Sequence, residues 1–236
     1  MNTAIIVAAG SSRRMGFDKL FALLAGKPVV AHSIAAFEQC EGIDEILLVV
    51  REDRVEEFEQ LVKREKYRKV SKVIAGGEER HISVWNGLQA VSVGTGYIAI
   101  HDGARPLVTP ELIQKCLVLA HEKGAVSCSA PIPDTVKRAS TDQVITESVE
   151  RSGLWAMQTP QVFNSGLILQ AYAAIMAKNE RVTDEVSAVQ RMGKKITLLK
   201  NEDWNLKVTF ACDLEIAEHI LAARNKAKKS KRRQTR

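Results

Sequence analysis

The stretch Thr3–Gly10, "TAIIVAAG", decides the class of fold. Its apolar residues are consecutive rather than alternating, which is typical of a strand that is covered on both faces. The strand then ends in small residues and Gly10, where the chain can turn with little side-chain bulk. In a sheet covered by helices on both faces, ligands bind beyond the carboxyl ends of the strands. A binding loop is therefore expected directly after this strand.

Similar apolar runs recur along the chain and alternate with segments of helical period. We expect strands over residues 3–9, 45–50, 72–75, 97–101, 125–131 and 195–200. We expect helices over residues 28–40, 54–64, 81–91, 110–122, 166–177 and 184–192, and a final helix that begins at Asp213. This strand–helix alternation predicts an α/β fold with a mainly parallel, doubly wound sheet.

Residues 131–163 break this regularity. The segment alternates polar and apolar residues and has no helical period, so we expect a β-hairpin arm that leaves the main sheet. A two-stranded hairpin is marginally stable by itself in water, and an exposed one needs another surface to hold it. A dimer contact through this arm is the expected consequence.

Composition and charge indicate one domain with a basic tail. The chain has 236 residues, of which 45% are hydrophobic, and a formal net charge of +6. Eight basic residues and no acidic residue lie in 224–236, whereas the remaining residues carry 26 basic and 28 acidic side chains. We therefore expect a single domain over residues 1–223 and a disordered tail over 224–236. Weak contact of this tail with RNA or an anionic surface is an alternative.

The cysteines and the start of the chain bear on location. Cys40, Cys116, Cys128 and Cys212 are widely spaced and form no CxxC pair, which fits reduced thiols rather than a disulfide framework or a zinc site. The chain starts without a basic n-region, and no apolar run approaches the roughly 20 residues that span a bilayer. We expect a cytoplasmic protein with no membrane contact.

The loop after the first strand carries positive charge where nucleotide-binding loops usually carry glycines. It matches neither the Walker A pattern nor the Rossmann fingerprint, since "GFDK" follows Met15 and position 12 is Ser. Backbone N–H groups of a small-residue turn can approach phosphates, and Arg13, Arg14 and Lys19 add charge. We interpret the loop as a phosphate-binding loop; a solvated basic loop is the alternative.

A second motif, "IHDGARP" (Ile100–Pro106), places Asp102 at the end of another apolar strand. Mg²⁺ in nucleotide sites is held by one or two carboxylates together with substrate phosphates, so Asp102 is a candidate Mg²⁺ ligand. The alternative is an aspartate that only caps the turn. His101 should face away from Asp102 along the strand and is interpreted as structural.

Seven motifs in order link the chain to a known family. They are "AAGSSRRMGFDK", "GGEERHISVWNGL", "HDGARP", "DTVKR", "LWAMQTPQVF", "TDEVSAV" and "KVT", and they extend over residues 3–210. Together they resemble the 2-C-methyl-D-erythritol 4-phosphate cytidylyltransferases of the non-mevalonate isoprenoid pathway. The resemblance implies a Rossmann-like nucleotidyltransferase fold, Mg²⁺ as cofactor, CTP and methylerythritol phosphate as substrates, and a homodimer joined through the β-arm.

The resemblance also implies roles for individual residues. The CTP loop corresponds to Ala8, Ala9, Gly10, Ser12, Arg14 and Lys19, and the cytosine- and ribose-contacting segment to Gly77, Glu78 and Ser83. The metal ligand corresponds to Asp102, and Gly103 follows it on the CTP side. The substrate side corresponds to Arg105, Thr183 and Asp184, to Lys207, and to Thr135 and Arg151 on the arm, which reach the partner's substrate. Arg14, Lys19 and Lys207 are the implied catalytic residues.

Three positions depart from the family pattern. Ser12 replaces a common Gly, Asp18 a common Pro, and Glu78 a more usual Asp. None of these changes removes a charge that the reaction needs.

Two other functions stay open at this stage. One is cytidylyl transfer to ribitol 5-phosphate, because both acceptors present a phosphate beside a small polyol. The other is a nucleotide- or RNA-binding protein without enzymatic activity, although such a protein need not keep a metal-binding carboxylate. For either transfer, a phosphate monoester is already a nucleophile near neutral pH, so no general base is expected.

Overall fold

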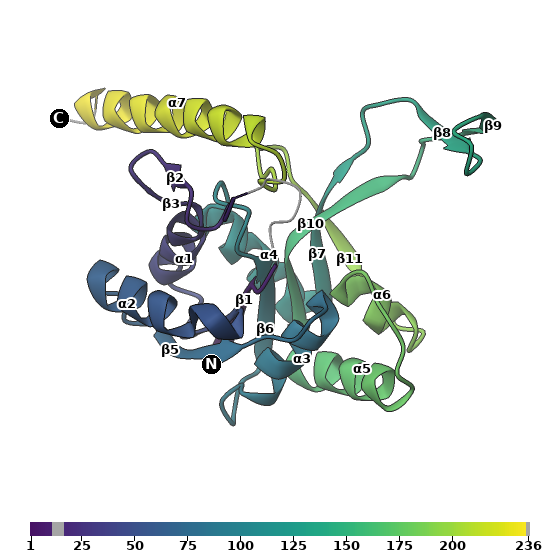
Figure 1. Cartoon of the computed structure of the whole chain (residues 1–236), viewed down its shortest axis with the longest axis horizontal. Helices are drawn as coiled ribbons and strands as arrows, with labels where there is room; N and C mark the ends of the chain where they lie inside the picture. The colour runs from purple at the N-terminus through teal and green to yellow at the C-terminus, as the bar shows by residue number, and fades with distance from the viewer. Residues whose placement is uncertain (11–16, 235–236) are drawn as a thin grey trace.

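The computed structural model describes residues 1–10 and 17–234 of the chain, with side chains described as far as residue 227. Its centre is a seven-stranded sheet with helices on both faces (Figure 1). The strand order is β11-β7-β10-β6-β1-β4-β5. The sheet is made of β1 (Asn2–Ala8), β4 (Glu45–Val50), β5 (Val70–Ala75), β6 (Tyr97–Asp102), β7 (Ala125–Pro131), β10 (Trp155–Asn164) and β11 (Thr197–Lys200).

All strand pairs of this sheet are parallel except those of β10, which runs antiparallel to β6 and β7. The predicted α/β class with a mainly parallel sheet is therefore confirmed. Because β1, β4, β5 and β6 are mutually parallel, their carboxyl ends meet at one edge. The loops after Ala8, Val50, Ala75 and Asp102 all start from that edge.

The described residues form seven α-helices. They are α1 (Val29–Gln39), α2 (Val55–Glu65), α3 (Arg80–Gln89), α4 (Pro110–Lys123), α5 (Ser165–Ala177), α6 (Glu185–Gln190) and α7 (Cys212–Gln234), with a 3₁₀ turn at Glu52–Arg54. Helices α1, α2 and α4 pack in one apolar cluster, and α3, α5 and α6 pack in a second cluster on the other face. Thr109 caps α4 as expected, since its hydroxyl accepts the N–H of Leu112.

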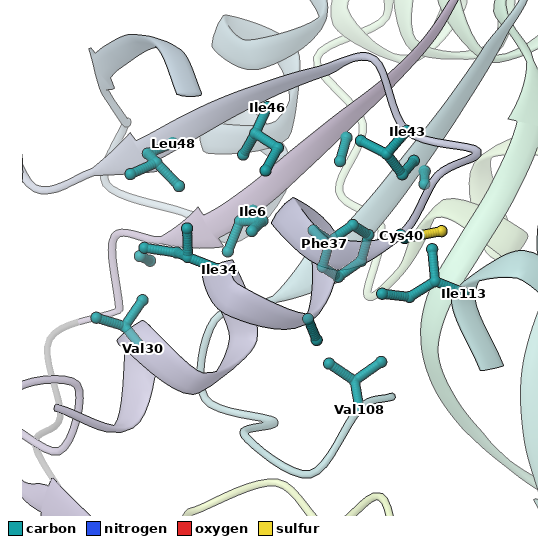
Figure 2. Packing of buried hydrophobic residues seen from close by; sticks show 14 of the residues in the cluster. Ile6, Val30, Ile34, Phe37, Cys40, Ile43, Ile46, Leu48, Val108 and Ile113 are labelled. Carbon is teal, nitrogen blue, oxygen red and sulfur yellow. The ribbon is translucent and has the colours of Figure 1, made fainter. Parts of the chain in front are cut away.

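The consecutive apolar residues of the central strands supply both clusters. In β4, Ile46 and Leu48 belong to the cluster of α1, whereas Leu47 and Val49 belong to the cluster of α3. Figure 2 shows the first cluster, in which side chains of β1 and β4 face Val30, Ile34 and Phe37 of α1. Burial on both faces explains why these strands lack polar alternation.

The arm is shorter than the sequence suggested. β8 (Val136–Ala139) and β9 (Ile145–Val149) form a separate two-stranded antiparallel sheet that extends away from the body (Figure 1). The expected boundary at residue 163 is wrong, because residues 155–164 are strand β10 of the main sheet. The alternating pattern of that segment arises because Gln161 and Thr159 are buried polar residues with hydrogen-bond partners.

The chain end also differs from the expectation. Helix α7 continues through residue 234, whereas disorder was expected from residue 224. Ala, Lys and Arg all have high helix propensity, and Arg224 is held by the backbone oxygens of Leu107 and Trp204 and by Asp203. A further short hairpin, β2 (Leu23–Leu24) with β3 (Lys27–Pro28), was not expected. Within the described residues, no helix combines the length and the apolar character that crossing a bilayer requires.

Candidate active site

A cleft of about 790 Å³ lies at the carboxyl edge of β1, β4, β5 and β6. Residues that follow all four strands line it, and one further residue comes from near the C-terminus. The predicted site residues in its lining are Ala8, Ala9, Gly10, Lys19, Gly77, Glu78, Ser83, Asp102 and Lys207. Nine predictions from five segments of the sequence therefore meet in one place.

The loop after β5 forms one wall of this cleft. Ser83 of α3 is almost fully buried, and its hydroxyl accepts the N–H of Gly77 at 3.2 Å. A Cβ on Gly76 would lie only 2.7 Å from both Ala9 Cβ and Ser83 Oγ, so this position has no room for a side chain. The wall therefore approaches the turn after β1 closely, and Ser83 fixes the loop that carries Glu78.

Lys19 is placed by its neighbours. Oδ1 of Asp18 accepts the N–H of Leu20 at 2.9 Å, and its other oxygen pairs with the guanidinium of Arg54. That guanidinium also lies 4.5 Å from the centre of the Phe21 ring. Asp18, which departs from the family pattern, thus anchors the backbone on both sides of Lys19. Ser12 and Arg14, the other two predicted loop residues with side-chain roles, lie outside the described residues.

Asp102 lies at the floor of the cleft and is surrounded by positive charge. Its side chain is only 10% exposed, with Arg80 Nη2 3.0 Å from Oδ1 and Lys207 Nζ 2.9 Å from Oδ2. Burial raises the pKa of the Asp102 carboxyl, but the charges of Arg80 and Lys207 outweigh burial and hold that pKa well below its usual range. Asp102 is therefore ionised throughout the physiological range.

His101 holds the backbone behind Asp102. Its Nδ1 is 2.9 Å from the hydroxyl of Thr159, which accepts the N–H of Asp102 at 3.0 Å, so the hydroxyl donates to the imidazole. Its Nε2 lies 3.3 Å from the carbonyl oxygen of Arg105 and acts as donor to it. Burial lowers the pKa of His101 to about 3. His101 is thus a neutral structural residue, and it packs against Phe37 on the far face.

Lys207 comes from residues 201–211, which have no regular strand and little helix. Three hydrogen bonds attach this segment to the loop after β6 and to β10: Val208 N–H donates to Ala104 O, Arg105 Nη1 to Asn205 O, and Asn205 Nδ2 to Thr159 O, each at 2.8 Å. The loop of Asp102 and the segment of Lys207 therefore form one rigid unit.

Some predicted residues lie outside the cleft lining. Arg105 is buried beneath Asp102, with Nε 3.5 Å from Oδ2. Gly103 donates its N–H to Val7 O, and a Cβ at this position would lie 3.3 Å from both Val30 Cγ2 and Val7 O, a tight contact. Asp184 caps α6 through Ser187 and accepts from Gln161. These three residues hold the site together.

The remaining substrate-side residues are exposed. Thr183 precedes α6, with its hydroxyl 3.4 Å from that of Ser187. Thr135 and Arg151 lie on the arm, away from the cleft of their own chain, and Arg151 donates to the backbone oxygen of Pro133. Neither arm residue lines the cleft that the structure describes.

Sequence reasoning missed Arg80. This residue begins α3, lines the cleft and contacts Asp102 directly. It lies within the quoted motif "GGEERHISVWNGL", next to the singled-out Gly77 and Glu78, and its charge was the available signal. Arg51, Glu52 and Asp53, which follow β4 and also line the cleft, were missed because a charged loop gives no distinct motif.

The side chains available as ligands indicate which kind of metal ion the cleft could hold. Within residues 1–10 and 17–234, no group of three His, Cys, Asp or Glu side chains could hold a metal ion. One carboxylate with open space beside it fits a Mg²⁺ ion whose other ligands are nucleotide phosphates and water. It does not fit a zinc site, which needs at least three protein ligands.

Comparison with known proteins now identifies the family. A family model described as 2-C-methyl-D-erythritol 4-phosphate cytidylyltransferase matches residues 2–223. The chain belongs to this family. Its reaction is the transfer of a cytidylyl group from CTP to 2-C-methyl-D-erythritol 4-phosphate in isoprenoid precursor synthesis, so the chain is a nucleotidyltransferase enzyme.

Relatives and solved structures agree with this cytidylyltransferase assignment. The chain is 42% identical over 223 residues to the 2-C-methyl-D-erythritol 4-phosphate cytidylyltransferase of Bacillus cytotoxicus, covering 94% of this chain and 98% of the relative. It is 38% identical to the enzyme of the same name from Alkaliphilus oremlandii, covering 96% and 97%.

A crystal structure of the 4-diphosphocytidyl-2C-methyl-D-erythritol synthase of Anaerococcus prevotii superposes on this chain with a TM-score of 0.82 at 27% identity. The match covers 94% of this chain and 96% of that one. The Thermus thermophilus 2-C-methyl-D-erythritol 4-phosphate cytidylyltransferase superposes with a TM-score of 0.77 at 26% identity, covering 94% and 100%. None of these four proteins is described as a ribitol phosphate enzyme or a nucleic-acid-binding protein, so nothing here favours the alternatives.

Proposed function

We propose that cytidylyl transfer takes place in the cleft beyond β1 and β6, with Mg²⁺ held by Asp102 and with a second copy of the chain completing the acceptor site. The observation that carries this proposal is the meeting of Lys19, Asp102 and Lys207 in one cleft with a buried, ionised carboxylate at its floor. The space beside these residues is large enough for a nucleotide.

The reaction requires charge neutralisation more than proton transfer. A phosphate oxygen of the acceptor attacks the α-phosphorus of CTP, a new P–O bond forms, and the bond to pyrophosphate breaks with its electron pair leaving on pyrophosphate. Both reactants are anions, so holding them in line and offsetting their charge are the main tasks. Lys19 lines the cleft, and its proposed role is to face the triphosphate.

Lys207 is proposed to orient the acceptor phosphate. The Lys207 side chain is 37% exposed and lines the cleft, so it can contact a bound anion while its ammonium group remains near Asp102. Mg²⁺, when bound, would offset charge on the phosphates and act as a template for them. The family role of Arg14 belongs to this proposal, although that residue lies outside the described residues.

The arm supports a homodimer with shared active sites. β8 and β9 pair only with each other in the described sheets, and Val144 and Ile145 are 62% and 66% exposed on this arm. Such a hairpin needs a partner surface, and a symmetric dimer supplies it twice. Thr135 and Arg151 would then contact the acceptor in the partner's cleft.

All four cysteines are free, which fits the reducing cytoplasm where we place the enzyme.

One assay tests the reaction and its metal. The purified chain is incubated with CTP, Mg²⁺ and either 2-C-methyl-D-erythritol 4-phosphate or ribitol 5-phosphate, and pyrophosphate release is followed. We expect turnover with the first acceptor, loss of turnover in EDTA and recovery on addition of Mg²⁺. Full activity in metal-free buffer would contradict the role of Asp102, and faster turnover with ribitol 5-phosphate would contradict the acceptor.

A further inference from the structure

A buried ion pair connects α6 to the floor of the cleft. Glu185, the first residue of α6, has a fully buried side chain, and its two carboxylate oxygens lie 2.6 and 3.2 Å from the guanidinium nitrogens of Arg80. The hydroxyl of Tyr172 on α5 donates to the same carboxylate at 3.1 Å. Glu185 does not line the cleft that the structure describes, and its contact with the cleft lining is through Arg80.

Arg80 is shared between this pair and the candidate metal ligand. Its Nε donates to Oδ1 of Asp102 at 3.1 Å, and its Nη2 lies 3.0 Å from the same oxygen. The other oxygen, Oδ2, accepts from Lys207 at 2.9 Å. Each oxygen of Asp102 therefore has its own cationic partner, and because Arg80 and Lys207 hold different oxygens, the two contacts together fix the carboxylate in rotation as well as in position.

Stability alone does not explain such an arrangement. Removing two charges from water is costly, and well-packed apolar residues of similar size are often at least as stabilising as a buried ion pair. An ion pair that extends from a buried helix end to one oxygen of a cleft carboxylate does, however, define an orientation. Buried partners of metal-ligating carboxylates commonly have this role.

We propose that Arg80, fixed by Glu185, is the positioning residue that sets the Asp102 carboxylate and, through it, the ammonium group of Lys207. This inference rests on the proposed metal role of Asp102. It assigns to Glu185 and Tyr172, which do not touch the cleft, an effect on the metal requirement and on turnover. Their helices, α6 and α5, thus act on the reaction without contacting the cleft.

The first test is Glu185→Gln, which keeps the shape of the side chain and removes its charge. We expect kcat to fall about 10- to 100-fold, and the Mg²⁺ concentration for half-maximal activity to rise by a similar factor, as for other partners of metal ligands. Calorimetric titration with CTP at several Mg²⁺ concentrations, without acceptor, should show weaker metal-dependent binding. Tyr172→Phe should shift both quantities in the same direction by a smaller factor.

A matched control separates positioning from stability. Glu45 is also a buried carboxylate, held by the hydroxyls of Thr3, Ser71 and Ser92 at the opposite edge of the sheet. Glu45→Gln should lower the melting temperature yet leave kcat and the Mg²⁺ requirement unchanged. Arg80→Met with Glu185→Leu replaces the whole ion pair by apolar side chains and removes the unpaired buried charge that either single change leaves.

The double variant decides the matter. We expect its melting temperature to return toward that of the wild type while kcat stays low and the Mg²⁺ requirement stays high. Wild-type kcat and Mg²⁺ dependence in the folded double variant would show that the pair only stabilises the fold, and the inference would be wrong. If the wild type itself needs no metal, the assignment of Asp102 fails first, and the positioning role then depends on the kcat of the double variant alone.

Discussion

The ammonium nitrogen of Lys207 lies 2.9 Å from Oδ2 of Asp102, although 105 residues separate the two in the chain. The contact joins an irregular segment near the C-terminus to the end of the central strand β6. Among the described residues, Lys207 is the closest positive neighbour of Oδ2, because Arg105 Nε lies 3.5 Å away. The pair therefore links the proposed metal ligand to the proposed acceptor-binding residue.

Lys207→Met should lower kcat by about 10²–10³, the range seen when one preorganised electrostatic donor is lost. The apolar stem is retained, so the fold should persist. The KM for the acceptor should rise, whereas the KM for CTP should change little. The control is Lys200→Met, which removes an exposed lysine that pairs with Glu202 at the end of β11. Near-normal turnover of Lys207→Met would return Lys207 to a purely structural role.

Lys19→Ala should reduce kcat by a similar factor of about 10²–10³, because the proposed role of Lys19 is to offset charge on the triphosphate. Steady-state kinetics and a melting curve are the measurements. Lys27→Ala is the matched control: Lys27 is 55% exposed, pairs with Glu65 and lies outside the cleft lining. If both variants turn over at the wild-type rate, the loop is only a solvated basic loop.

The shared active site can be tested by complementation. Arg151→Ala and Lys19→Ala should each be inactive as homodimers. In a mixed dimer, one of the two sites receives both wild-type residues. Each mixed dimer should therefore have about half of the activity of a wild-type dimer. Subunit exchange is checked independently with differently tagged chains. Exchange without recovered activity would mean that Arg151 acts within its own chain.

The fold should lose stability as the pH falls from 7 to 5, in part through His101. Its pKa is lowered by burial to about 3 in the folded chain, whereas an unfolded histidine titrates near about 6.5. Between these values the unfolded chain binds a proton that the folded chain does not, so lower pH favours unfolding. For one such group the loss between pH 7 and pH 5 is about 2 kcal/mol.

Replacing the imidazole tests how much His101 contributes to the pH dependence of stability. His101→Gln keeps a donor and an acceptor for Arg105 O and Thr159 but does not titrate, so its unfolding free energy should vary less between pH 7 and pH 5. Denaturant unfolding at the two pH values measures the difference. His219→Gln, which changes an exposed histidine of α7, should keep the wild-type slope. An unchanged slope in His101→Gln would contradict the argument.

Truncation separates the two parts of the C-terminal helix. A chain that ends at Ala227 keeps Arg224 and should retain wild-type kcat, while retention on heparin falls because six basic residues are removed. A chain that ends at Ala223 also loses the bonds of Arg224 to Leu107, Asp203 and Trp204. It should melt at a lower temperature. Equal melting temperatures for the two truncations would show that Arg224 does not anchor this loop.

Much of the fold could be predicted from hydrophobic pattern. Strands 45–50 and 125–131 agree with β4 and β7 to the residue, and in β4 burial on both faces leaves a nearly continuous apolar run. β10 was the main error, because it carries buried polar residues whose partners lie elsewhere in the chain. An amide or hydroxyl that is satisfied at long range looks, in sequence, like one that faces water.

The site was predictable where a residue itself follows a strand or belongs to a motif. Lys19, Asp102 and Lys207 meet in the cleft as the resemblance implied. The Arg80–Glu185 pair was not predictable, since its partners are 105 residues apart and only the tertiary fold brings them together. Gly103, Arg105 and Asp184 lie outside the cleft lining, which shows that a motif can contain residues that hold a site in place as well as residues that line it.

The irregular segment that carries Lys207 has a consequence for biosynthesis. Its place is set by Ala104 and Arg105 within the body and by Arg224, which secures the loop of Asp203 and Trp204 from helix α7. A ribosome must therefore release the residues through Arg224 before the segment of Lys207 is fully held at Asp102. Nascent chains can build the central sheet early, yet they should acquire catalytic competence only when the last helix has emerged and docked.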